Sequence, residues 1–364
     1  MENQIVVLGA GESGVGAAIL GQKKGLKVFV SDCGTISKEN IKVLSNNEIE
    51  WEQGKHTMKK ILQAKEVVKS PGIADNIEII QAIKSAGISV ISEIEFAFRY
   101  TKAKVVAITG SNGKTTTTLL VGHILKKAGL DVLVAGNIGF GFAKEIAKRD
   151  YDYIVLELSS FQLDGIKEFK PNVAIILNIT PDHLNRYEND FNKYIESKFR
   201  ITMNQEKEDV LIYNKDDKAI KKGLKTKAKK IAITLENQMV ADGAFYKNNE
   251  ININLNNNKM TIQELALQGK HNIYNSMAAA IATRILDVKN DIIRQSMLDF
   301  QNIEHRLEYV LSVHGIDFIN DSKATNINAA WYALESMTKP VIWIVGGVDK
   351  GHDYDEIVEI VGEK

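Results

Sequence analysis

The residues best suited to chemistry in this sequence follow a glycine-rich turn, Gly110-Ser-Asn-Gly-Lys-Thr-Thr116. Glycines let backbone N–H groups face a phosphate, and the start of a helix adds partial positive charge. Lys114 can reach the β- and γ-phosphates, and the Thr115 hydroxyl can hold Mg²⁺. The full pattern G-x-x-x-x-G-K-[ST] needs glycine at position 108, where Ile108 stands, so only the shorter form is present. The plain alternative is a strand-to-helix turn with a solvated lysine, but we predict binding of ATP or a related nucleotide.

A second glycine turn, Gly9-Ala-Gly11-Glu-Ser13-Gly14, follows a short apolar run near the amino terminus. The next expected strand, Lys27–Asp32, ends in a carboxylate 18 positions after Gly14. This is the dinucleotide-type fingerprint, in which the glycines approach a diphosphate and the acid binds a ribose. The pattern suits NAD or another ligand with a diphosphate and a ribose, such as a UDP-sugar. Ser70-Pro71-Gly72 ends a further expected strand, and its spacing alone favours a plain turn.

Three later apolar runs are expected to be parallel strands of one sheet: residues 132–135, 153–158 and 173–179. Polar residues gather after them, where open α/β sheets place their ligands. Glu157 is the most informative, because a buried carboxylate must hold a cation or be paired. His183, by its spacing alone, is more often a surface or core residue than a ligand. Lys198, by the same criterion, belongs to the solvated face of a helix.

The rest of the chain continues the α/β pattern. Short strands and hairpins are expected over residues 209–267, and Asn272 and Asn275 can cap the helix that follows. A strand pair at 307–320 and a buried strand at Val341–Val345 are expected towards the carboxyl end. We predict an α/β fold with three parts: a Rossmann-like domain (1–92), a central P-loop α/β domain (93–302) and a partial Rossmann-like C-terminal domain (303–364).

Composition excludes several classes of protein. The 364 residues include 46 Lys+Arg and 46 Asp+Glu, so no basic field favours nucleic acid or an anionic membrane. The single cysteine excludes an internal disulfide framework and a multi-cysteine metal site. No signal peptide is visible, and no run reaches the roughly 18 apolar residues that a membrane helix needs. We expect a cytoplasmic protein, as a monomer.

Several motifs occur together in the order of a known family. Taken with the two glycine turns, they resemble the Mur ligases, ATP-dependent amide-forming enzymes of peptidoglycan precursor synthesis, over most of the chain. The Ser159-Ser-Phe-Gln-Leu163 motif, with Ser70-Pro-Gly72, favours the D-glutamate-adding branch. The other motifs are Thr109–Thr116, Asn178–His183 with Arg186-Tyr187, Gly269–Asn275, His305-Arg306, Asn320–Asn326 and Gly346–Gly351.

The resemblance implies an acceptor, UDP-N-acetylmuramoyl-L-alanine, bound mainly by the first domain. Its UDP part would contact residues of three turns: Gly11, Ser13, Gly14, Asp32, Ser70, Pro71 and Gly72. Asn137 and Ser159 would lie along the sugar and the lactyl-alanyl arm. The second substrate, D-glutamate, would contact Thr325 and Lys350.

The resemblance also implies the ATP and metal sites. ATP would be bound by the phosphate loop and by residues of later segments: Gly110, Ser111, Asn112, Gly113, Lys114, Thr115, Thr116, Asn272, Arg306 and Asp321. Thr115 and Glu157 would hold one Mg²⁺, and His183 and Lys198 a second, with Lys198 carbamylated by CO₂. The catalytic residues would be Lys114, Glu157, His183, Lys198 and Lys323. The alanyl carboxylate would be phosphorylated by ATP, and the D-glutamate amine would then displace phosphate from the acyl phosphate.

One departure from the family and three rival interpretations remain. The segment from Ile303 has only 62 residues, whereas a complete family member has a larger C-terminal domain. We therefore expect a truncated chain that binds the UDP substrate but is weakly active or inactive. The nearest rival is another ligase, such as a different Mur ligase or a folylpolyglutamate synthetase. The others are an NAD-dependent oxidoreductase, which leaves the phosphate loop unexplained, and a nucleotide-sensing module without turnover.

Overall fold

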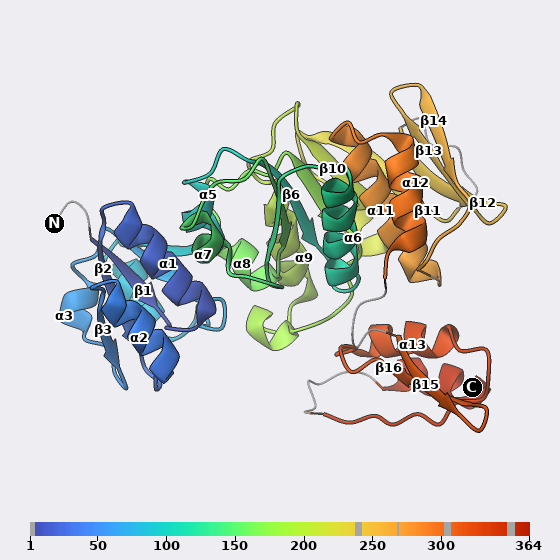
Figure 1. The fold of residues 1–364 in the computed structure, drawn as a ribbon. Helices are drawn as coiled ribbons and strands as arrows, with labels where there is room; N and C mark the ends of the chain where they lie inside the picture. Colours follow the sequence, from blue (N-terminus) through green and yellow to red (C-terminus); the bar gives the residue numbers. More distant parts are fainter. Residues whose placement is uncertain (1–3, 237–241, 268, 302–306, 348–353) are drawn as a thin grey trace.

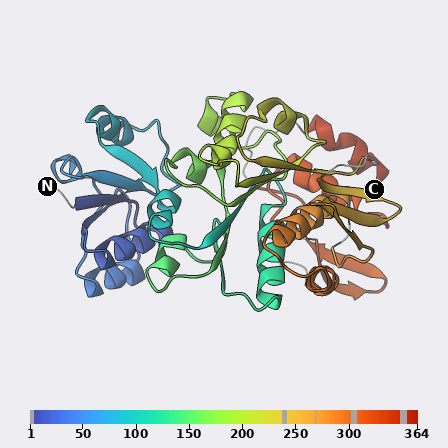
Figure 2. The ribbon, with the colours of Figure 1, turned by 90° about the horizontal axis from the view of Figure 1, so that it is seen from above.

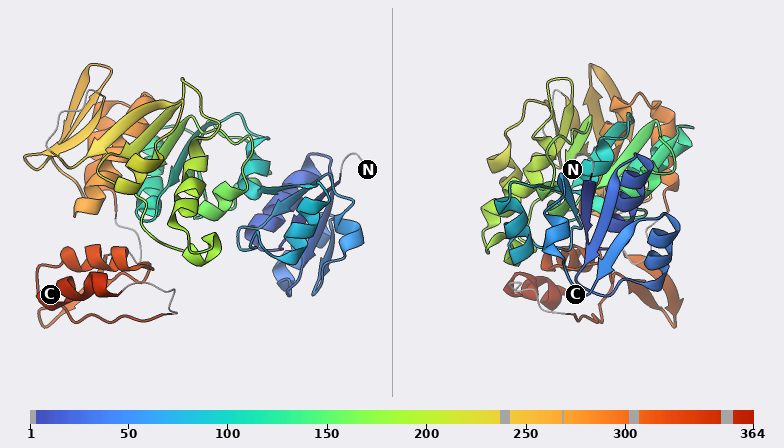
Figure 3. Two further views of the ribbon diagram at one scale, coloured as in Figure 1. Left: turned by 180° about the vertical axis from the view of Figure 1, so that it is seen from behind. Right: turned by 90° about the vertical axis from the view of Figure 1, so that its left-hand side faces the viewer.

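The computed structural model describes residues 4–236, 242–267, 269–301, 307–347 and 354–364. Its elements form three groups along the chain, each with its own sheet (Figure 1). The group at the amino end and the one at the carboxyl end both adjoin the central group, and the views from two sides agree on this (Figure 3). None of the helices within the described residues is long and apolar enough to cross a membrane.

The first group is a five-stranded parallel sheet in the order β3-β2-β1-β4-β5. Alternate residues of β1 enter the two faces of this sheet: Ile5 and Val7 pack into one core, Val6 and Leu8 into another. Its elements are β1 (Gln4–Leu8), α1 (Glu12–Lys23), β2 (Lys27–Asp32), α2 (Lys38–Asn46), β3 (Glu50–Gln53), α3 (Met58–Ile61), β4 (Glu66–Lys69), α4 (Glu78–Ser85) and β5 (Ser89–Ser92).

The central group is a nine-stranded sheet in the order β14-β13-β12-β11-β10-β9-β6-β8-β7. The strands from β7 to β12 are parallel, and β13 and β14 extend the sheet as an antiparallel hairpin. The first half of this group contains α5 (Glu93–Phe98), β6 (Lys104–Thr109), α6 (Lys114–Lys127), β7 (Val132–Gly136), α7 (Phe142–Ile146), β8 (Tyr153–Glu157), α8 (Ser160–Asp164), β9 (Val173–Ile176), η1 (Leu184–Tyr187), α9 (Phe191–Phe199) and η2 (Arg200–Thr202).

The second half of the central group supplies the hairpins and the helices that cover them: β10 (Val210–Asn214), α10 (Lys218–Gly223), β11 (Lys229–Thr234), β12 (Gly243–Lys247), β13 (Glu250–Leu255), β14 (Asn258–Ile262), α11 (Lys270–Ile285) and α12 (Asn290–Asp299). Helices cover both faces of the sheet (Figure 2): α6, α11 and α12 pack on one core, α8 and α9 on the other. Strand β6 stands between β8 and β9, so the order of connection reverses beside it. Open α/β sheets bind ligands at the carboxyl ends of strands at such a reversal.

The last group is small: β15 (Glu308–Val313), β16 (Ile316–Asn320), α13 (Ile327–Glu335) and α14 (Asp355–Glu363). The two strands form an antiparallel hairpin, and Leu334, Ile357 and Ile360 form a core between the two helices. The buried strand expected at Val341–Val345 is wrong. This run is not a strand in the structure, and Ile344 is 93% exposed. It has the apolar composition of a strand, but within the described residues it has no strand beside it to supply the ladder of hydrogen bonds.

The first and central groups meet where α1 packs against α5 and α7. The approach is close, because a Cβ atom added to Gly16 of α1 would lie 2.9 Å from the backbone nitrogen of Lys144 in α7. Glu93, at the start of α5, is buried here and accepts a hydrogen bond from the N–H of Ala143. Burial raises the pKa of Glu93 to about 7; the Ala143 N–H offsets part of this effect, and the nearby Glu12 carboxylate adds to it.

Candidate active site at the carboxyl end of the central sheet

The glycine-rich loop lies directly after β6, as the sequence predicts. Gly113 has φ +81° and is the residue before the first turn of α6. A Cβ atom there would lie 2.4 Å from the side-chain oxygen of Asn275 in α11, so both backbone conformation and space favour glycine. The Lys114 ammonium donates to the carbonyl oxygens of Gly110 at 2.9 Å and Ser111 at 2.8 Å. The loop therefore holds its lysine over its own backbone, where a phosphate can take the place of the carbonyls.

The neighbouring strand β8 supplies a buried carboxylate beside this loop. Glu157 is 2% exposed, and its two oxygens accept from the Thr115 hydroxyl at 2.8 Å and the Asn137 amide at 2.9 Å. Thr115 and Glu157, which the resemblance assigns to one Mg²⁺, are thus joined by a hydrogen bond. Oxygen donors of this kind suit Mg²⁺, which takes one or two protein oxygens and completes its shell with phosphate and water. Within the described residues no three His, Cys, Asp or Glu side chains form a metal cluster, so a cation here would need such additional oxygens.

Lys198 enters the same site from α9. It is 2% exposed, its ammonium donates to Gly110 O at 2.9 Å, and it lies 4.5 Å from the centre of the Tyr194 ring. Burial lowers the pKa of Lys198 well below its usual value, and the nearby Lys114 charge lowers it further; Asp182 and Asp164 oppose both effects. The interpretation from spacing alone, a lysine on a solvated helix face, is wrong. Lys198 is a buried amine that shares one backbone carbonyl with the loop lysine.

His183 lies at the edge of this cluster. It precedes η1 with φ +53°, its side chain is 40% exposed, and its Nε2 atom is 3.6 Å from Asp182. Its ring meets the Phe161 ring edge-on, with centroids 5.3 Å apart. Asp182 is itself buried, and one of its oxygens has no hydrogen-bond partner among the described residues. Asp182, which the sequence analysis did not single out, lies beside His183, and its charge also acts on Lys198.

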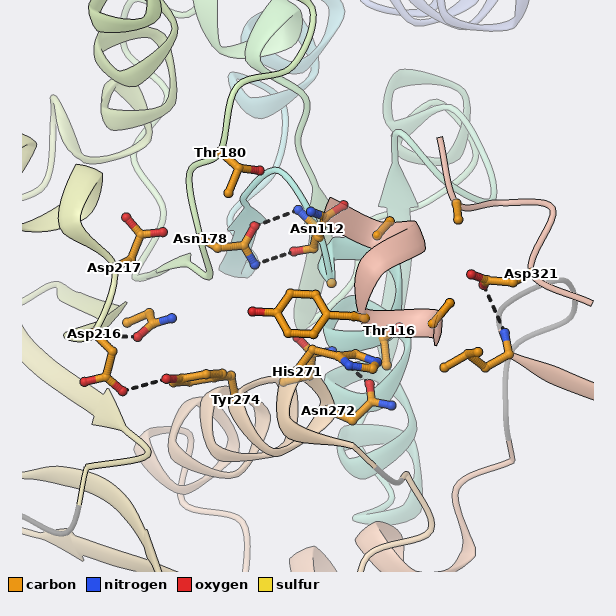
Figure 4. Close-up of a pocket in the computed structure, with 18 residues that line it drawn as sticks. Asn112, Thr116, Asn178, Thr180, Asp216, Asp217, His271, Asn272, Tyr274 and Asp321 are labelled. Atoms are coloured by element: carbon orange, nitrogen blue, oxygen red, sulfur yellow. Dashed lines mark hydrogen bonds between the residues drawn. The ribbon is translucent and has the colours of Figure 1, made fainter. Parts of the chain in front are cut away.

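A cavity of about 260 Å³ opens beside the phosphate loop (Figure 4). Its walls come from the loop, the ends of β9 and β10, the start of α11 and the C-terminal group. Asn112, Gly113, Thr116, Asn272 and Asp321, all predicted to bind ATP, are among its lining residues. The sequence also allowed Asn272 and Asn275 to cap this helix. They do not, because α11 begins earlier, after Gly269.

Two acidic residues of this cavity were missed by the sequence analysis. Asp216 and Asp217 come two and three residues after β10 ends at Asn214, and both line the cavity. Asp216 accepts from the Tyr274 hydroxyl at 2.6 Å (Figure 4). Asp217 accepts from the N–H of Ile179 at 2.9 Å. Their position at the carboxyl end of an apolar run was the available signal, the same one that indicated Glu157.

The glycine turn of the first group has a different construction. A Cβ atom on Gly14 would lie 1.9 Å from the Gly9 carbonyl oxygen, and one on Gly9 would lie 2.6 Å from the Ser70 hydroxyl. Asp32 accepts from the N–H groups of Ala10 at 2.7 Å and Gly34 at 2.8 Å. Three predicted binding elements, the glycine turn, Asp32 and Ser70, therefore lie together at one edge of this sheet.

The remaining predicted residues are less concentrated. Ser159 caps α8 in a reciprocal arrangement with Gln162, and Ser13 lies in the first turn of α1. Lys323 and Thr325 are exposed and are not among the residues that line the cavity, although Asp321 and Ala324 beside them are. Asn326 reaches the phosphate loop, donating to the Asn112 side chain at 3.0 Å. His305, Arg306 and Lys350 lie outside the described residues.

Comparison with known families agrees with this geometry. Residues 3–92 match the family described as Mur ligase MurD-like, N-terminal domain, and residues 108–283 match the Mur ligase middle domain. Solved structures share the fold. A pseudomurein peptide ligase type C from Methanothermus fervidus has a TM-score of 0.56 at 25% identity, covering 93% of this chain and 78% of that one. UDP-N-acetylmuramate-alanine ligase from Thermotoga maritima has a TM-score of 0.56 at 18% identity, covering 92% and 77%. The chain belongs to the Mur ligase family, as its motifs predicted.

Curated relatives place the similarity within one branch of this family. The chain is 51% identical to the UDP-N-acetylmuramoylalanine–D-glutamate ligase of Christiangramia forsetii, over all of this chain and 83% of that protein. It is also 51% identical to the enzyme of the same name from Porphyromonas gingivalis, over all of this chain and 82% of that protein. The D-glutamate-adding branch, favoured by Ser159–Leu163, is the branch of these relatives.

Proposed function

We propose that this chain is an ATP-dependent ligase that joins D-glutamate to UDP-N-acetylmuramoyl-L-alanine in cytoplasmic peptidoglycan precursor synthesis. One observation carries the proposal: Lys114, Thr115, Glu157 and Lys198 converge at the carboxyl end of β6. An NAD-dependent oxidoreductase has no use for this cluster. The relatives' names support the choice of D-glutamate over the amino acids of other Mur ligases.

The reaction must bring two anions together, because the alanyl carboxylate attacks the γ-phosphate of ATP. Lys114 supplies fixed positive charge where negative charge develops, which is the largest effect an active site of this kind can offer. The carboxylate oxygen forms the acyl phosphate and ADP leaves. The D-glutamate amine then attacks the carbonyl carbon, and the tetrahedral intermediate releases phosphate and leaves an amide.

The residues around the loop fit a divalent cation. Thr115 and Glu157 would hold one Mg²⁺, and His183 with a modified Lys198 would hold a second. Bound Mg²⁺ would neutralise phosphate charge and orient the phosphates. Asn137 would keep the Glu157 carboxylate oriented through the hydrogen bond at its other oxygen.

Carbamylation of Lys198 is the part of this proposal that the chain's own geometry supports best. Burial lowers the pKa of Lys198 and so favours its uncharged amine, whose lone pair can attack the carbon of CO₂. A nitrogen–carbon bond forms, the nitrogen loses a proton, and the product is an anionic carbamate. The neighbouring Lys114 cation would stabilise that anion. An amine that repels a cation would thereby become an oxygen ligand for one.

The substrates would divide between the groups of elements. The UDP part would bind Gly11, Ser13, Gly14, Asp32 and the Ser70–Gly72 turn, with Asn137 and Ser159 along the acceptor arm. Gly110 to Thr116, Asn272, Arg306 and Asp321 would bind ATP; Thr325 and Lys350 would bind D-glutamate, and Lys323 would reach the reacting centre. Residues 1–92, 93–302 and 303–364 would act as the acceptor, ATP and amino-acid domains of a monomer.

The test is phosphate release from ATP by the chain, with each candidate amino acid and acceptor supplied in turn. We expect release only when both UDP-N-acetylmuramoyl-L-alanine and D-glutamate are present. Release with another amino acid or with a folate acceptor would favour the rival ligases, and nucleotide binding without any release would favour a sensing module. ¹³C-labelled CO₂ should give a carbamate signal in nuclear magnetic resonance that Lys198→Arg lacks; the same signal in that variant would contradict the role of Lys198.

A further inference from the structure

Arg186 connects the central group to the turn Ser70–Ile73 of the first group, which is proposed to bind the acceptor. The proposed function assigns no role to this contact. Its guanidinium donates from Nη1 to Gly72 O at 3.3 Å and from Nη2 to Pro71 O at 3.4 Å and Ile73 O at 3.3 Å. Arg186 belongs to η1, more than 110 residues beyond the turn. Backbone carbonyls of the first group thus accept hydrogen bonds from a side chain of the central group.

The same turn is held from the other side by a buried cation. Lys69, the last residue of β4, is 5% exposed and donates to Ile73 O at 2.7 Å and to Asp75 at 3.0 Å. The Ile73 carbonyl therefore accepts from Lys69 within its own group and from Arg186 across the boundary. Lys69 thus holds one end of the turn from within the first group, and Arg186 contacts three of its carbonyls from the central group.

The position of this turn matters because it packs on the glycine turn. The Ser70 hydroxyl donates to Gly9 O at 3.4 Å, and an added Cβ atom on Gly9 would collide with the same hydroxyl. A shift of the Ser70–Ile73 segment would therefore change the space in which the diphosphate and ribose of a bound acceptor must fit.

The other face of Arg186 is turned towards the central site. Its guanidinium carbon lies 4.4 Å from the centre of the Phe161 ring, which also contacts the His183 ring and stacks on Tyr187 at 6.2 Å. Phe161 belongs to α8, which follows the Glu157 strand and packs beside β5 of the first group. A planar cation is required for this dual contact, since it stacks through its face while donating through its edge.

We propose that Arg186 is a positioning residue for the acceptor: it sets the Ser70–Ile73 turn against the central site and links that turn through Phe161 to His183. The inference rests on the proposed function for the identity of the acceptor. The contact itself is independent of that identity, so the two can fail separately.

The experiment compares Arg186→Ala and Arg186→Lys with Arg200→Lys. Arg200 is a matched control, because its guanidinium also donates to two backbone carbonyls, Leu163 O and Ile166 O, but within the central group. Calorimetric titration would measure binding of UDP-N-acetylmuramoyl-L-alanine and, separately, of a non-hydrolysable ATP analogue. Loss of the three hydrogen bonds and the stacking is expected to weaken acceptor binding roughly 5- to 30-fold in both Arg186 variants. ATP-analogue binding should not change in them, and Arg200→Lys should bind both ligands normally.

Hydrogen exchange of the turn amides supplies a second readout that needs no ligand. Residues 70–73 should exchange faster in both Arg186 variants, and at the wild-type rate in Arg200→Lys. Unchanged acceptor affinity or unchanged exchange in Arg186→Ala would overturn the inference, as would an equal loss of ATP-analogue binding, which would indicate general damage. A wild-type chain that binds no UDP-N-acetylmuramoyl-L-alanine would overturn the proposed acceptor instead, while exchange would still decide whether Arg186 holds the turn.

Discussion

The chain contains two strand–glycine–helix turns, and they differ in the charges around them. At the Gly9–Gly14 turn the structure places a carboxylate, Asp32, whose oxygens accept backbone N–H groups. At the Gly110–Thr116 turn it places two lysine nitrogens on one carbonyl and a carboxylate, Glu157, on the threonine hydroxyl. Backbone N–H groups and a helix start are common to both turns.

This difference shows that a glycine turn supplies a place for phosphate, whereas the side chains around it decide what happens there. An acid that accepts backbone N–H groups suits a ligand that is held by its ribose hydroxyls and left unchanged. Lysines, hydroxyls and a buried carboxylate suit a phosphoryl group that is transferred. Variants that alter one turn and leave the other intact test this difference in role.

Loss of the loop lysine should have the largest effect. Lys114→Ala is expected to lower turnover by roughly 10³-fold, because it removes the fixed cation that faces the developing charge. Binding of UDP-N-acetylmuramoyl-L-alanine should be unaffected, since that ligand uses the other turn. Rate assays and calorimetric titration would check both. Lys126→Ala, an exposed residue at the far end of α6, is the control; similar losses in both variants would contradict a specific role for Lys114.

Adding a methyl group to the first turn should come next. Gly14→Ala places a Cβ atom 1.9 Å from the Gly9 carbonyl oxygen, whereas Gly11→Ala has no atom within 4 Å. We expect Gly14→Ala to lower the free energy of unfolding by about 3 kcal/mol and Gly11→Ala to change it little. Denaturant unfolding would measure the difference. Equal stabilities would show that the backbone there relaxes freely.

The stability of the contact between the first and central groups, where Glu93 is buried, should depend on pH. The folded protein holds the Glu93 proton up to about pH 7, whereas an unfolded glutamate releases it near 4.5. This group therefore stabilises the fold fully below about pH 4.5, and its contribution is lost as the pH rises through 7. Glu93→Gln should remove that dependence and be more stable than wild type by roughly 2 kcal/mol at pH 8, with a smaller advantage at pH 5.

The matched control for this variant is Glu95→Gln on the same helix. The Glu95 carboxylate accepts from the N–H groups of residues 167–169 and pairs with Arg99, so its charge is used by the fold. We expect Glu95→Gln to destabilise at pH 8, opposite in sign to Glu93→Gln. Thermal unfolding at several pH values would compare them, and the same sign for both would refute the distinction.

The smallest effect is expected at the ribose carboxylate. Asp32→Asn retains one acceptor oxygen but turns an N–H₂ group towards one of the two backbone donors. It should weaken UDP-N-acetylmuramoyl-L-alanine binding roughly tenfold, the cost of about one charge-assisted hydrogen bond. Binding of an ATP analogue should stay at the wild-type level. A parallel loss at both sites would show that the two turns are not independent.

Most of the fold was predictable because its strands are short apolar runs that end in glycine or polar residues. Lys27–Asp32 is a strand over the residues expected, and the hairpins near residues 243–262 were indicated by turn residues. The strand predicted at Val341–Val345 was wrong because composition shows which residues a strand prefers but not whether a neighbouring strand is present. The predicted start of α11 was wrong because Asn272 and Asn275 are good caps in isolation, whereas here both lie within the helix, beside the phosphate loop.

The site was only partly predictable. Glu157 was found because a lone carboxylate after an apolar run must be paired. Lys198 lies on a helix whose pattern suggests exposure, and only the folded chain brings it to Gly110, 88 positions away. Asp182 and Arg186 act through partners on other elements, and no local pattern reports such contacts.

The carbonyl of Gly110 has a consequence for how the nucleotide is admitted. It accepts from both Lys114 and Lys198, so one peptide oxygen joins the loop lysine to the lysine of α9. A phosphate oxygen of the nucleotide has to replace this peptide oxygen before it can accept a hydrogen bond from Lys114. A ligand that offers several anionic oxygens at once compensates best for that exchange, so we expect the loop to favour a polyphosphate over a small monovalent anion.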